Sequence, residues 1–275
     1  MPATWSGRIG GHREPVPFRL LGCPQPSCFL LAHPWYHVIL TRSFQGEKGG
    51  AAAMDIRRYE VSFDKLSAKK AETLGKLGPA LLSDAMKGAN TLGGGIRPVA
   101  TGVKMVGQAR TVESYYDNTA ACVALPLMKA GEVLVIDANE GSDFAVFGDI
   151  TALEAVKRNL GGMVTNGVVR DSAAIRAMGL PLFCRGTIPR GPGPFARGVI
   201  DSPIRVGGVT IKPGDVIVGD DDGVVAIPLE QVDTVIAAAK DKEKREAGWI
   251  AAVNAGKSLA EAHGFPEAKL IKRSA

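Results

Sequence analysis

The stretch VLVIDANEGSDFAVFGDITALEAVKRNLGGMVTNGVVRDSAAIRAMGLPLFC, Val133 to Cys184, decides the fold of this chain of 275 residues. Its apolar runs are short enough to be buried strands, and they lie at 133–137, 163–165 and 180–184. Between them, residues 150–160 and 172–178 place apolar side chains at helical spacing, and both segments stop at glycine. The stretch therefore predicts a β-α-β-α-β unit with right-handed crossovers in a mostly parallel sheet.

Upstream of this unit, leucines and alanines recur at helical spacing from Ser67 to Lys87. Gly78-Pro79 predicts a break between two helices there, and glycines 93–95 predict a turn. The pattern then favours two strands, at 103–106 and 109–112, followed by a helix over 118–128.

Downstream, the proline- and glycine-rich run Pro189-Arg-Gly-Pro-Gly-Pro194 separates the unit from a β layer. Residues 204–211 predict a hairpin with a Gly-Gly turn, and further strands lie between 215 and 227. Residues 229–254 read as a long amphipathic helix with a solvated charge run at 240–246. The fold class is α/β, with a β-hairpin layer and a long C-terminal helix.

The first 53 residues differ in composition from the rest. They hold three of the four histidines and two of the three tryptophans, with scattered prolines. Regular patterning begins only at Met54. We expect residues 1–53 to be an irregular or disordered extension, or the product of an upstream start codon, and residues 54–275 to be the folded domain.

Bulk composition excludes some classes of protein. With 45% apolar and 22% charged residues and no apolar run near the roughly 20 residues of a membrane span, a membrane protein is excluded. The net charge of +5 arises mostly in residues 1–53, which hold five basic side chains against two acidic ones, so no nucleic-acid partner is expected. Four cysteines without a C-x-x-C pair fit a reduced cytoplasmic compartment, and Cys122 and Cys184 read as small buried hydrophobes.

Three residues lie where an α/β sheet collects ligands, at the starts of helices that follow strands. Gly148-Asp149 opens one helix and Arg170-Asp171 opens the next. Arginine offers a fork for a carboxylate, and aspartate offers a hard oxygen ligand for a divalent cation. Each aspartate could instead be a helix cap. An arginine gains nothing from the dipole at that end, so the Arg170-Asp171 pair favours a site.

The spacing of Asp149, twenty residues, then Arg170-Asp171 resembles the D-x20-R-D signature of the RraA-like proteins. These include 4-hydroxy-4-methyl-2-oxoglutarate aldolases, oxaloacetate decarboxylases and the regulator of ribonuclease E activity. The resemblance covers most of the chain after Met54; its other motifs are Ser83-Asp-Ala85, Gly107-Gln-Ala-Arg-Thr111, Gly167-Val-Val-Arg-Asp171, Pro213-Gly-Asp215 and Asp220-Asp-Asp-Gly-Val-Val225.

The resemblance implies a swivelling β/β/α-type domain that assembles into homotrimers or homohexamers with sites between subunits. It also implies that Asp171 binds Mg²⁺ or Mn²⁺, that Asp149 holds a water of the metal shell and that Arg170 grips a small 2-oxo acid. The substrate carboxylate would rest on the backbone N–H groups of Ile150, Thr151 and Ala152. Glu246, on the C-terminal helix, is the candidate for an acidic residue that a neighbouring subunit contributes.

The expected activity is that of a lyase. Retro-aldol cleavage of 4-hydroxy-4-methyl-2-oxoglutarate or 4-carboxy-4-hydroxy-2-oxoadipate, and decarboxylation of oxaloacetate, all pass through a metal-stabilised pyruvate enolate. Two departures from the family pattern, Ala174 and Asn166 at positions that are often acidic, leave specificity open. The alternative is a non-catalytic regulator that binds an RNA-processing enzyme. A methyltransferase is disfavoured because no glycine-rich nucleotide loop follows a strand.

Overall fold

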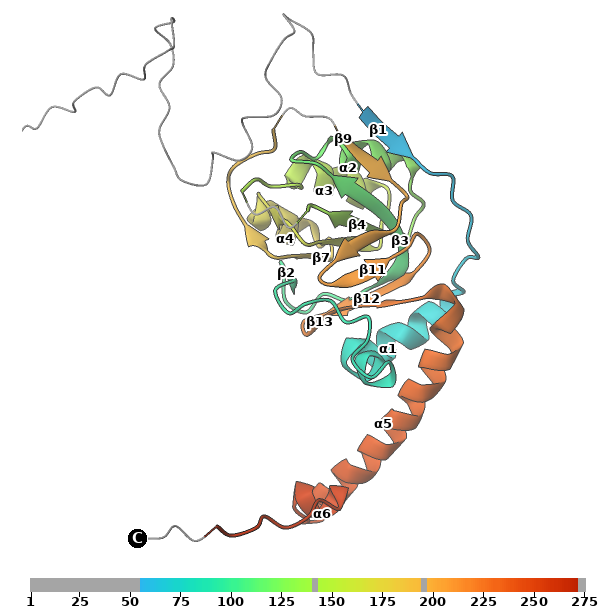
Figure 1. The fold of residues 1–275 in the computed structure, drawn as a ribbon, viewed down its shortest axis with the longest axis vertical. Coiled ribbons are helices and arrows are strands. Elements are labelled where there is room, and N and C mark those ends of the chain that lie inside the picture. Colours follow the sequence, from blue (N-terminus) through green and yellow to red (C-terminus); the bar gives the residue numbers. More distant parts are fainter. Residues whose placement is uncertain (1–54, 140–142, 194–196, 272–275) are drawn as a thin grey trace, which may run out of the picture. The chain divides into compact units, whose positions relative to one another are not determined.

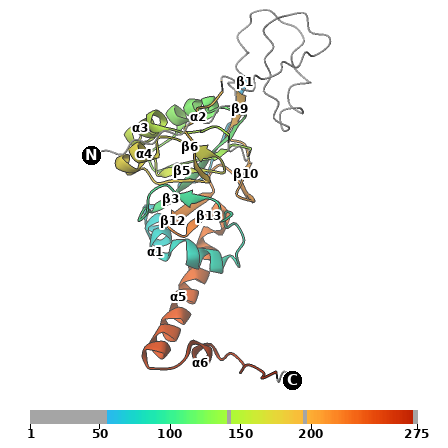
Figure 2. The same ribbon diagram turned by 90° about the vertical axis from the view of Figure 1, so that its left-hand side faces the viewer.

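The computed structural model describes residues 55–139, 143–193 and 197–271. The expected extension at residues 1–53 and the candidate start at Met54 lie outside these described residues. Figures 1 and 2 show the layers of the described part: α2, α3 and α4 cover one face of the main sheet, and a second β layer lies on the other face. Helices α1 and α5 pack against that second layer.

Among the described residues, helices and strands alternate up to residue 178, strands alone occur between residues 182 and 227, and helices follow from residue 229. In chain order they are β1 (Asp55–Arg58), α1 (Ala68–Ala85), β2 (Arg97–Pro98), β3 (Met105–Ser114), α2 (Thr119–Ala124), η1 (Leu125–Leu127), β4 (Val133–Asp137), α3 (Asp149–Lys157), β5 (Gly162–Thr165), β6 (Val168–Val169), α4 (Ser172–Met178), β7 (Leu182–Cys184), β8 (Gly186–Thr187), β9 (Arg197–Ile200), β10 (Ile204–Val206), β11 (Val209–Ile211), β12 (Val216–Asp220), β13 (Gly223–Ile227), η2 (Leu229–Gln231), α5 (Val232–Asn254) and α6 (Leu259–His263).

The predicted β-α-β-α-β unit is confirmed as β4-α3-β5-α4-β7. Its three strands are parallel neighbours in the sheet order β1-β9-β3-β4-β5-β7-β2. Every residue of β5 and β7 is buried, which explains why these strands read as apolar runs rather than as alternating patterns. Because the strands are parallel, their carboxyl ends meet at one edge of the sheet, and α3 and α4 both begin beyond it.

The prediction of two strands at 103–106 and 109–112 is wrong, because β3 runs unbroken from Met105 to Ser114. Its first half pairs with β12 and its second half with β4 and β9, so β3 joins the two β layers. Gly107 and Gln108, which lie between the two predicted strands, are both buried. Gln108 accepts from Leu66 N at 2.9 Å and donates to Asp64 O at 2.8 Å, so its amide needs no water.

The other predicted elements are confirmed with small shifts. Helix α1 is kinked at Gly78, whose φ of 73° lies in the left-handed region, and Pro79 follows it. The hairpin β10–β11 and the pair β12–β13 form as expected. Helix α5 buries Val232, Val235 and Ala239 against α1 and the second β layer.

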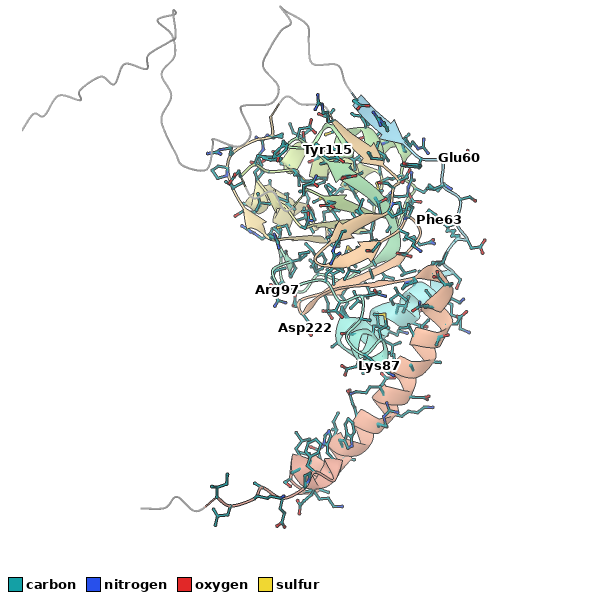
Figure 3. All side chains as sticks on the ribbon, in the orientation of Figure 1. Glu60, Phe63, Lys87, Arg97, Tyr115 and Asp222 are labelled. Carbon is teal, nitrogen blue, oxygen red and sulfur yellow. The ribbon has the colours of Figure 1, made fainter. Side chains whose placement is uncertain are left out.

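Figure 3 shows Arg97 beside Asp222, whose backbone carbonyl accepts a hydrogen bond from the Arg97 guanidinium at 2.6 Å.

A buried ion-pair network fixes the middle of β3. Arg110 is 5% exposed and forms a two-pronged bond to Asp201, at 2.7 and 2.6 Å. The same guanidinium lies 3.3 Å from Glu132 and donates to Leu127 O at 3.1 Å. The hydrogen bond to Asp201 raises the pKa of Arg110, so the group stays charged. The Gly107–Thr111 motif is therefore structural at Arg110.

Within the described ranges, no helix is long and apolar enough to cross a membrane.

Candidate active site

A small parallel ribbon brings the starts of α3 and α4 together. The segment before α3 runs beside β6: Ala145 forms a parallel bridge with Val168, and Val146 N donates to Val168 O at 3.0 Å. Arg170 N then donates to Phe147 O at 3.0 Å, and β8 pairs with the other edge of β6. Backbone bonds therefore place Arg170 next to Gly148 and Asp149.

Asp171 occupies the cap position of α4 without acting as a side-chain cap. Its backbone lies in the left-handed region, with φ 56° and ψ 34°, and its side chain makes no capping bond. Instead, Asp171 Oδ2 lies 3.2 Å from Arg170 Nε and 3.4 Å from Asp149 N. The capping explanation therefore fails for Asp171, whose carboxylate lies instead against the start of the neighbouring helix α3.

The N-terminus of α3 already binds carboxylate oxygens. Asp149 Oδ1 accepts from Ile150 N at 2.8 Å, in keeping with the preference of helix N-termini for negative charge. The Thr151 hydroxyl accepts from Gly148 N at 3.0 Å and donates to Gly148 O at 2.8 Å. Ala152 N donates to Gly148 O at 3.0 Å. The Ala152 amide is thus bonded within the helix. Of the three amides expected to hold the substrate carboxylate, those of Ile150 and Thr151 remain, and the Ile150 amide is available only when Asp149 Oδ1 releases it.

Two glycines leave the space that Arg170 and Asp171 occupy. A Cβ added at Gly148 would lie 2.8 Å from Asp171 Oδ2 and 3.2 Å from Arg170 Nε. A Cβ added at Gly191 would lie 2.7 Å from Arg170 Nη1. Sequence reasoning missed this role for both glycines, because nothing in the local pattern shows that residue 191 folds back onto residue 170.

We expect Gly148→Ala to lower activity and metal affinity by about tenfold or more while the chain stays folded. Gly148 has φ −147° and ψ −169°, which alanine adopts freely, so the added methyl group acts only by displacing Asp171 and Arg170. Gly186→Ala is the matched control, since its Cβ would meet only Val168 Cγ1 at 3.9 Å. Calorimetric titration with Mg²⁺ and a rate assay check this. Wild-type affinity and rate in Gly148→Ala would contradict the assigned geometry.

Asn166 has a structural reason to differ from the acidic residue that the family often carries. Its Oδ1 accepts from Ala138 N at 2.7 Å, while its Nδ2 donates to Asp137 Oδ1 at 2.8 Å and lies 3.3 Å from Arg205 O. The residue as a whole is 1% exposed. A carboxylate in this place would face the Asp137 carboxylate and could not donate, so the amide suits its buried surroundings.

The acidic candidate on the C-terminal helix is distant from these residues within one chain. Glu246 pairs with Lys242 at 3.7 Å, and Lys242 also pairs with Asp84 at 3.0 Å, at the end of α1. In Figures 1 and 2, α5 continues past α1 on the opposite side of the domain from α3 and α4. One chain by itself does not bring Glu246 to Asp171.

The side chains at this site suit an ion such as Mg²⁺, which keeps several water ligands, better than an ion that protein side chains surround completely. Among the described residues, no group of three or more histidine, cysteine, aspartate or glutamate side chains could hold a metal. Of the residues that the structure describes, the site offers Asp149 and Asp171, whose side chains provide oxygen donors. Mg²⁺ is commonly bound by one or two carboxylates with water or substrate completing its shell, so these residues fit that ion.

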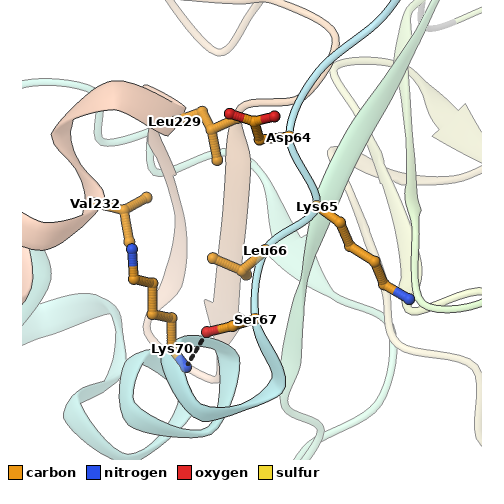
Figure 4. A pocket seen from close by; sticks show the side chains of 7 residues that line it. All are labelled: Asp64, Lys65, Leu66, Ser67, Lys70, Leu229 and Val232. Carbon is orange, nitrogen blue, oxygen red and sulfur yellow. Dashed lines mark hydrogen bonds between the residues drawn. The ribbon is translucent and has the colours of Figure 1, made fainter.

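Two other features of the described residues carry no comparable chemistry. Figure 4 shows a hollow at the starts of α1 and α5, where Ser67 Oγ accepts from Lys70 N at 3.3 Å; it is lined by Asp64, Lys65, Leu66, Ser67, Lys70, Leu229 and Val232. None of these belongs to the site. Cys184 is buried as predicted, and burial raises its pKa to about 11, which keeps the thiol protonated.

Comparison with known proteins gives a consistent result. The Aldolase/RraA family model, named RraA-like, matches residues 79–226. A protein of Halalkalibacterium halodurans whose provisional name is 4-hydroxy-4-methyl-2-oxoglutarate aldolase is 40% identical over 163 residues, which cover 59% of this chain and 78% of that protein.

Two solved structures have the same fold. An uncharacterised protein from Pseudomonas syringae is 28% identical with a TM-score of 0.65, and the match covers 73% of this chain and 100% of that one. An unusual member of the RNase ES inhibitor RraA protein family from Streptomyces coelicolor is 26% identical with a TM-score of 0.60, covering 66% of this chain and 96% of that one.

Proposed function

We propose that this chain, which belongs to the RraA-like family, is a divalent-metal-dependent lyase that cleaves small 2-oxo diacids to pyruvate. Its substrates would be 4-hydroxy-4-methyl-2-oxoglutarate, 4-carboxy-4-hydroxy-2-oxoadipate or oxaloacetate. The name of the Halalkalibacterium halodurans relative supports an aldolase. Mg²⁺ or Mn²⁺ would be held by Asp171 directly and by Asp149 through water.

One observation carries the proposal. The Asp171 carboxylate does not cap its own helix and lies 3.2 Å from Arg170 Nε and 3.4 Å from Asp149 N, beside the Ile150 amide, which already donates to a carboxylate oxygen of Asp149. The arrangement combines a ligand for a hard cation, a fixed positive charge and a helix N-terminus. Each of these stabilises negative charge, and the described side chains there include no nucleophilic cysteine or lysine that would form a covalent intermediate.

The residues would divide the reaction as follows. Amides of Ile150 and Thr151 hold the substrate carboxylate once the Asp149 carboxylate turns away from Ile150 N. Cleavage breaks the C3–C4 bond and leaves its electron pair on the three-carbon fragment as an enolate, while the other fragment departs as a carbonyl compound or as CO₂. Arg170 faces the developing negative charge with a fixed guanidinium. Asp149 orients the water that takes the hydroxyl proton in the retro-aldol case and returns a proton to C3.

A bound divalent cation supplies Lewis-acid stabilisation of the oxygen that becomes negative.

Coupled measurement of pyruvate release tests the proposal. Purified protein would be assayed with oxaloacetate and with each branched 4-hydroxy-2-oxo diacid, with Mg²⁺, with Mn²⁺ and with excess chelator. We expect turnover that requires the metal and returns when it is restored. Absence of pyruvate release from all three substrates in the presence of metal would overturn the proposal.

A second candidate is a regulator that binds an RNA-processing enzyme. The observation in its favour is the likeness to the Streptomyces coelicolor protein, whose family is named for inhibition of RNase ES. Under this alternative, the chain would bind an RNase without metal-dependent turnover. The assay above separates the two functions, because a regulator would release no pyruvate.

We also propose that a second copy of the chain completes the site, in a homotrimer or homohexamer. Ile150 and Leu153 are 76% and 46% exposed on α3 beside the site. The far end of the C-terminal helices exposes a second apolar set, with Ile250 at 62% and Phe265 at 61%. Exposed apolar surfaces of this kind mark interfaces. Their contact between copies would bring Glu246 of one chain toward Asp171 of another.

We expect Glu246→Gln to lower pyruvate release by about 100-fold, because it removes a proton-accepting group from the site, while leaving oligomer mass unchanged by light scattering. Glu243→Gln, on the exposed side of the same helix, is the control. Mixing Glu246→Gln with Asp171→Asn chains under exchanging conditions should restore part of the activity, since hybrid interfaces contain intact sites. A fully active Glu246→Gln protein would contradict this role.

A further inference from the structure

The proline-rich loop at residues 188–193 forms three backbone hydrogen bonds with neighbouring segments. Ile188 N donates to Val169 O at 2.9 Å, and Ala145 N donates to Arg190 O at 2.9 Å. Gly193 N donates to Tyr116 O at 3.3 Å. Pro189 and Pro192 restrict φ on either side of Arg190 and Gly191. The loop therefore holds a defined conformation alongside the same ribbon that positions Arg170.

This loop brings the backbone next to a second arginine, Arg190, close to Arg170. Gly191 lies against Arg170, since a Cβ there would be 2.7 Å from Nη1, and Arg190 is its chain neighbour. The Arg190 side chain is exposed and makes no ion pair with any residue in the described ranges. Arg170, in contrast, is paired with Asp171 at 3.2 Å. The Arg170 guanidinium is thus paired with Asp171 in the candidate site. The Arg190 guanidinium has no ion pair among the described residues and can bind an additional anion.

We propose that Arg190 binds the distal carboxylate of the substrate and makes the enzyme selective for 2-oxo diacids over 2-oxo monoacids. This inference rests on the proposed lyase function. A diacid brings two carboxylates, and the one remote from the oxo group needs its own cation. A guanidinium binds a carboxylate in a forked geometry that lysine cannot reproduce. Because the loop is pre-ordered, little conformational freedom is lost on binding.

Three variants and two substrates test the inference. Arg190→Gln and Arg190→Lys would be compared with Arg176→Gln, which alters an exposed arginine in the last turn of α4. Steady-state cleavage would be measured with oxaloacetate, a diacid, and with 4-hydroxy-2-oxopentanoate, a monoacid. Exchange of the pyruvate methyl protons in D₂O, followed by NMR with Mg²⁺, would report the enolate chemistry alone, because pyruvate lacks a distal carboxylate.

We expect Arg190→Gln to raise KM for oxaloacetate by about 10- to 100-fold, the usual cost of one charge-assisted contact. Its monoacid KM and its proton-exchange rate should stay within about twofold of wild type, and Arg190→Lys should recover part of the loss. An oxaloacetate KM no more affected than in Arg176→Gln would overturn the inference while exchange in the wild type still supported the lyase. Absence of both cleavage and exchange in the wild type would instead overturn the proposed function itself, and the inference with it.

Discussion

Replacing Asp171 by asparagine is expected to lower metal-dependent pyruvate release by at least about 100-fold, because it removes the charged oxygen that would hold the cation. Asparagine is the informative substitution, since Asp171 has φ 56° and asparagine tolerates the left-handed region well. Alanine would add backbone strain to the loss of the carboxylate. The measurement is the initial rate at saturating Mg²⁺, together with Mg²⁺ affinity by calorimetric titration.

Asp143→Asn is the matched control for this variant. Asp143 is an exposed aspartate in the segment that precedes α3, and it makes no ion pair with the residues that the structure describes. Its replacement should leave both the rate and the metal affinity unchanged. If Asp171→Asn instead kept a rate within about threefold of wild type, Asp171 would not be the metal ligand.

The second large effect concerns stability. We expect Arg110→Met to lower the free energy of unfolding by about 3–5 kcal/mol, because it leaves the buried Asp201 carboxylate without its two-pronged partner. The Asp201 side chain is 0% exposed, so water cannot replace the guanidinium. Urea unfolding followed by circular dichroism measures the change. Arg58, whose Nε lies 3.5 Å from Asp201 Oδ2, would compensate only in part.

Lys76→Met serves as the comparison for a surface ion pair. Lys76 pairs with Glu72 at 2.6 Å, yet the two side chains are 74% and 66% exposed. Solvent screens such a pair, and the urea midpoint should not move measurably. Equal midpoints for Arg110→Met and wild type would show that the buried network contributes no net stability.

Local patterns predicted the central unit well because each strand and helix there is specified by neighbouring residues. The runs at 133–136 and Leu182–Cys184 are buried on both faces, and Gly179 ends α4 with φ 71°. Strand β3 was misjudged for the opposite reason. Its Gln108 is satisfied by Leu66 N, 42 residues away in sequence, and Arg110 by Asp201, 91 residues away. Such partners leave no periodic signal.

The candidate site shows the same division. The sequence placed Asp149 and Arg170-Asp171 at two helix starts on one sheet edge, and the structure brings them within hydrogen-bonding distance. The sequence could not show that the Asp171 side chain makes no capping bond, because this depends on the left-handed backbone conformation of a non-glycine residue. The sequence also could not show that Gly191 lies against Arg170, because this contact depends on backbone hydrogen bonds that hold the loop at residues 188–193 in place.

Exchange of the pyruvate methyl protons with D₂O tests the central claim most directly, because it requires only the enolate chemistry assigned to Asp171 and Arg170. The account predicts loss of the methyl proton signal in the presence of Mg²⁺ and wild-type protein. It also predicts exchange at the background rate after chelation or in Asp171→Asn. Exchange by Asp171→Asn at the wild-type rate, or no exchange by the wild type with saturating metal, would contradict it.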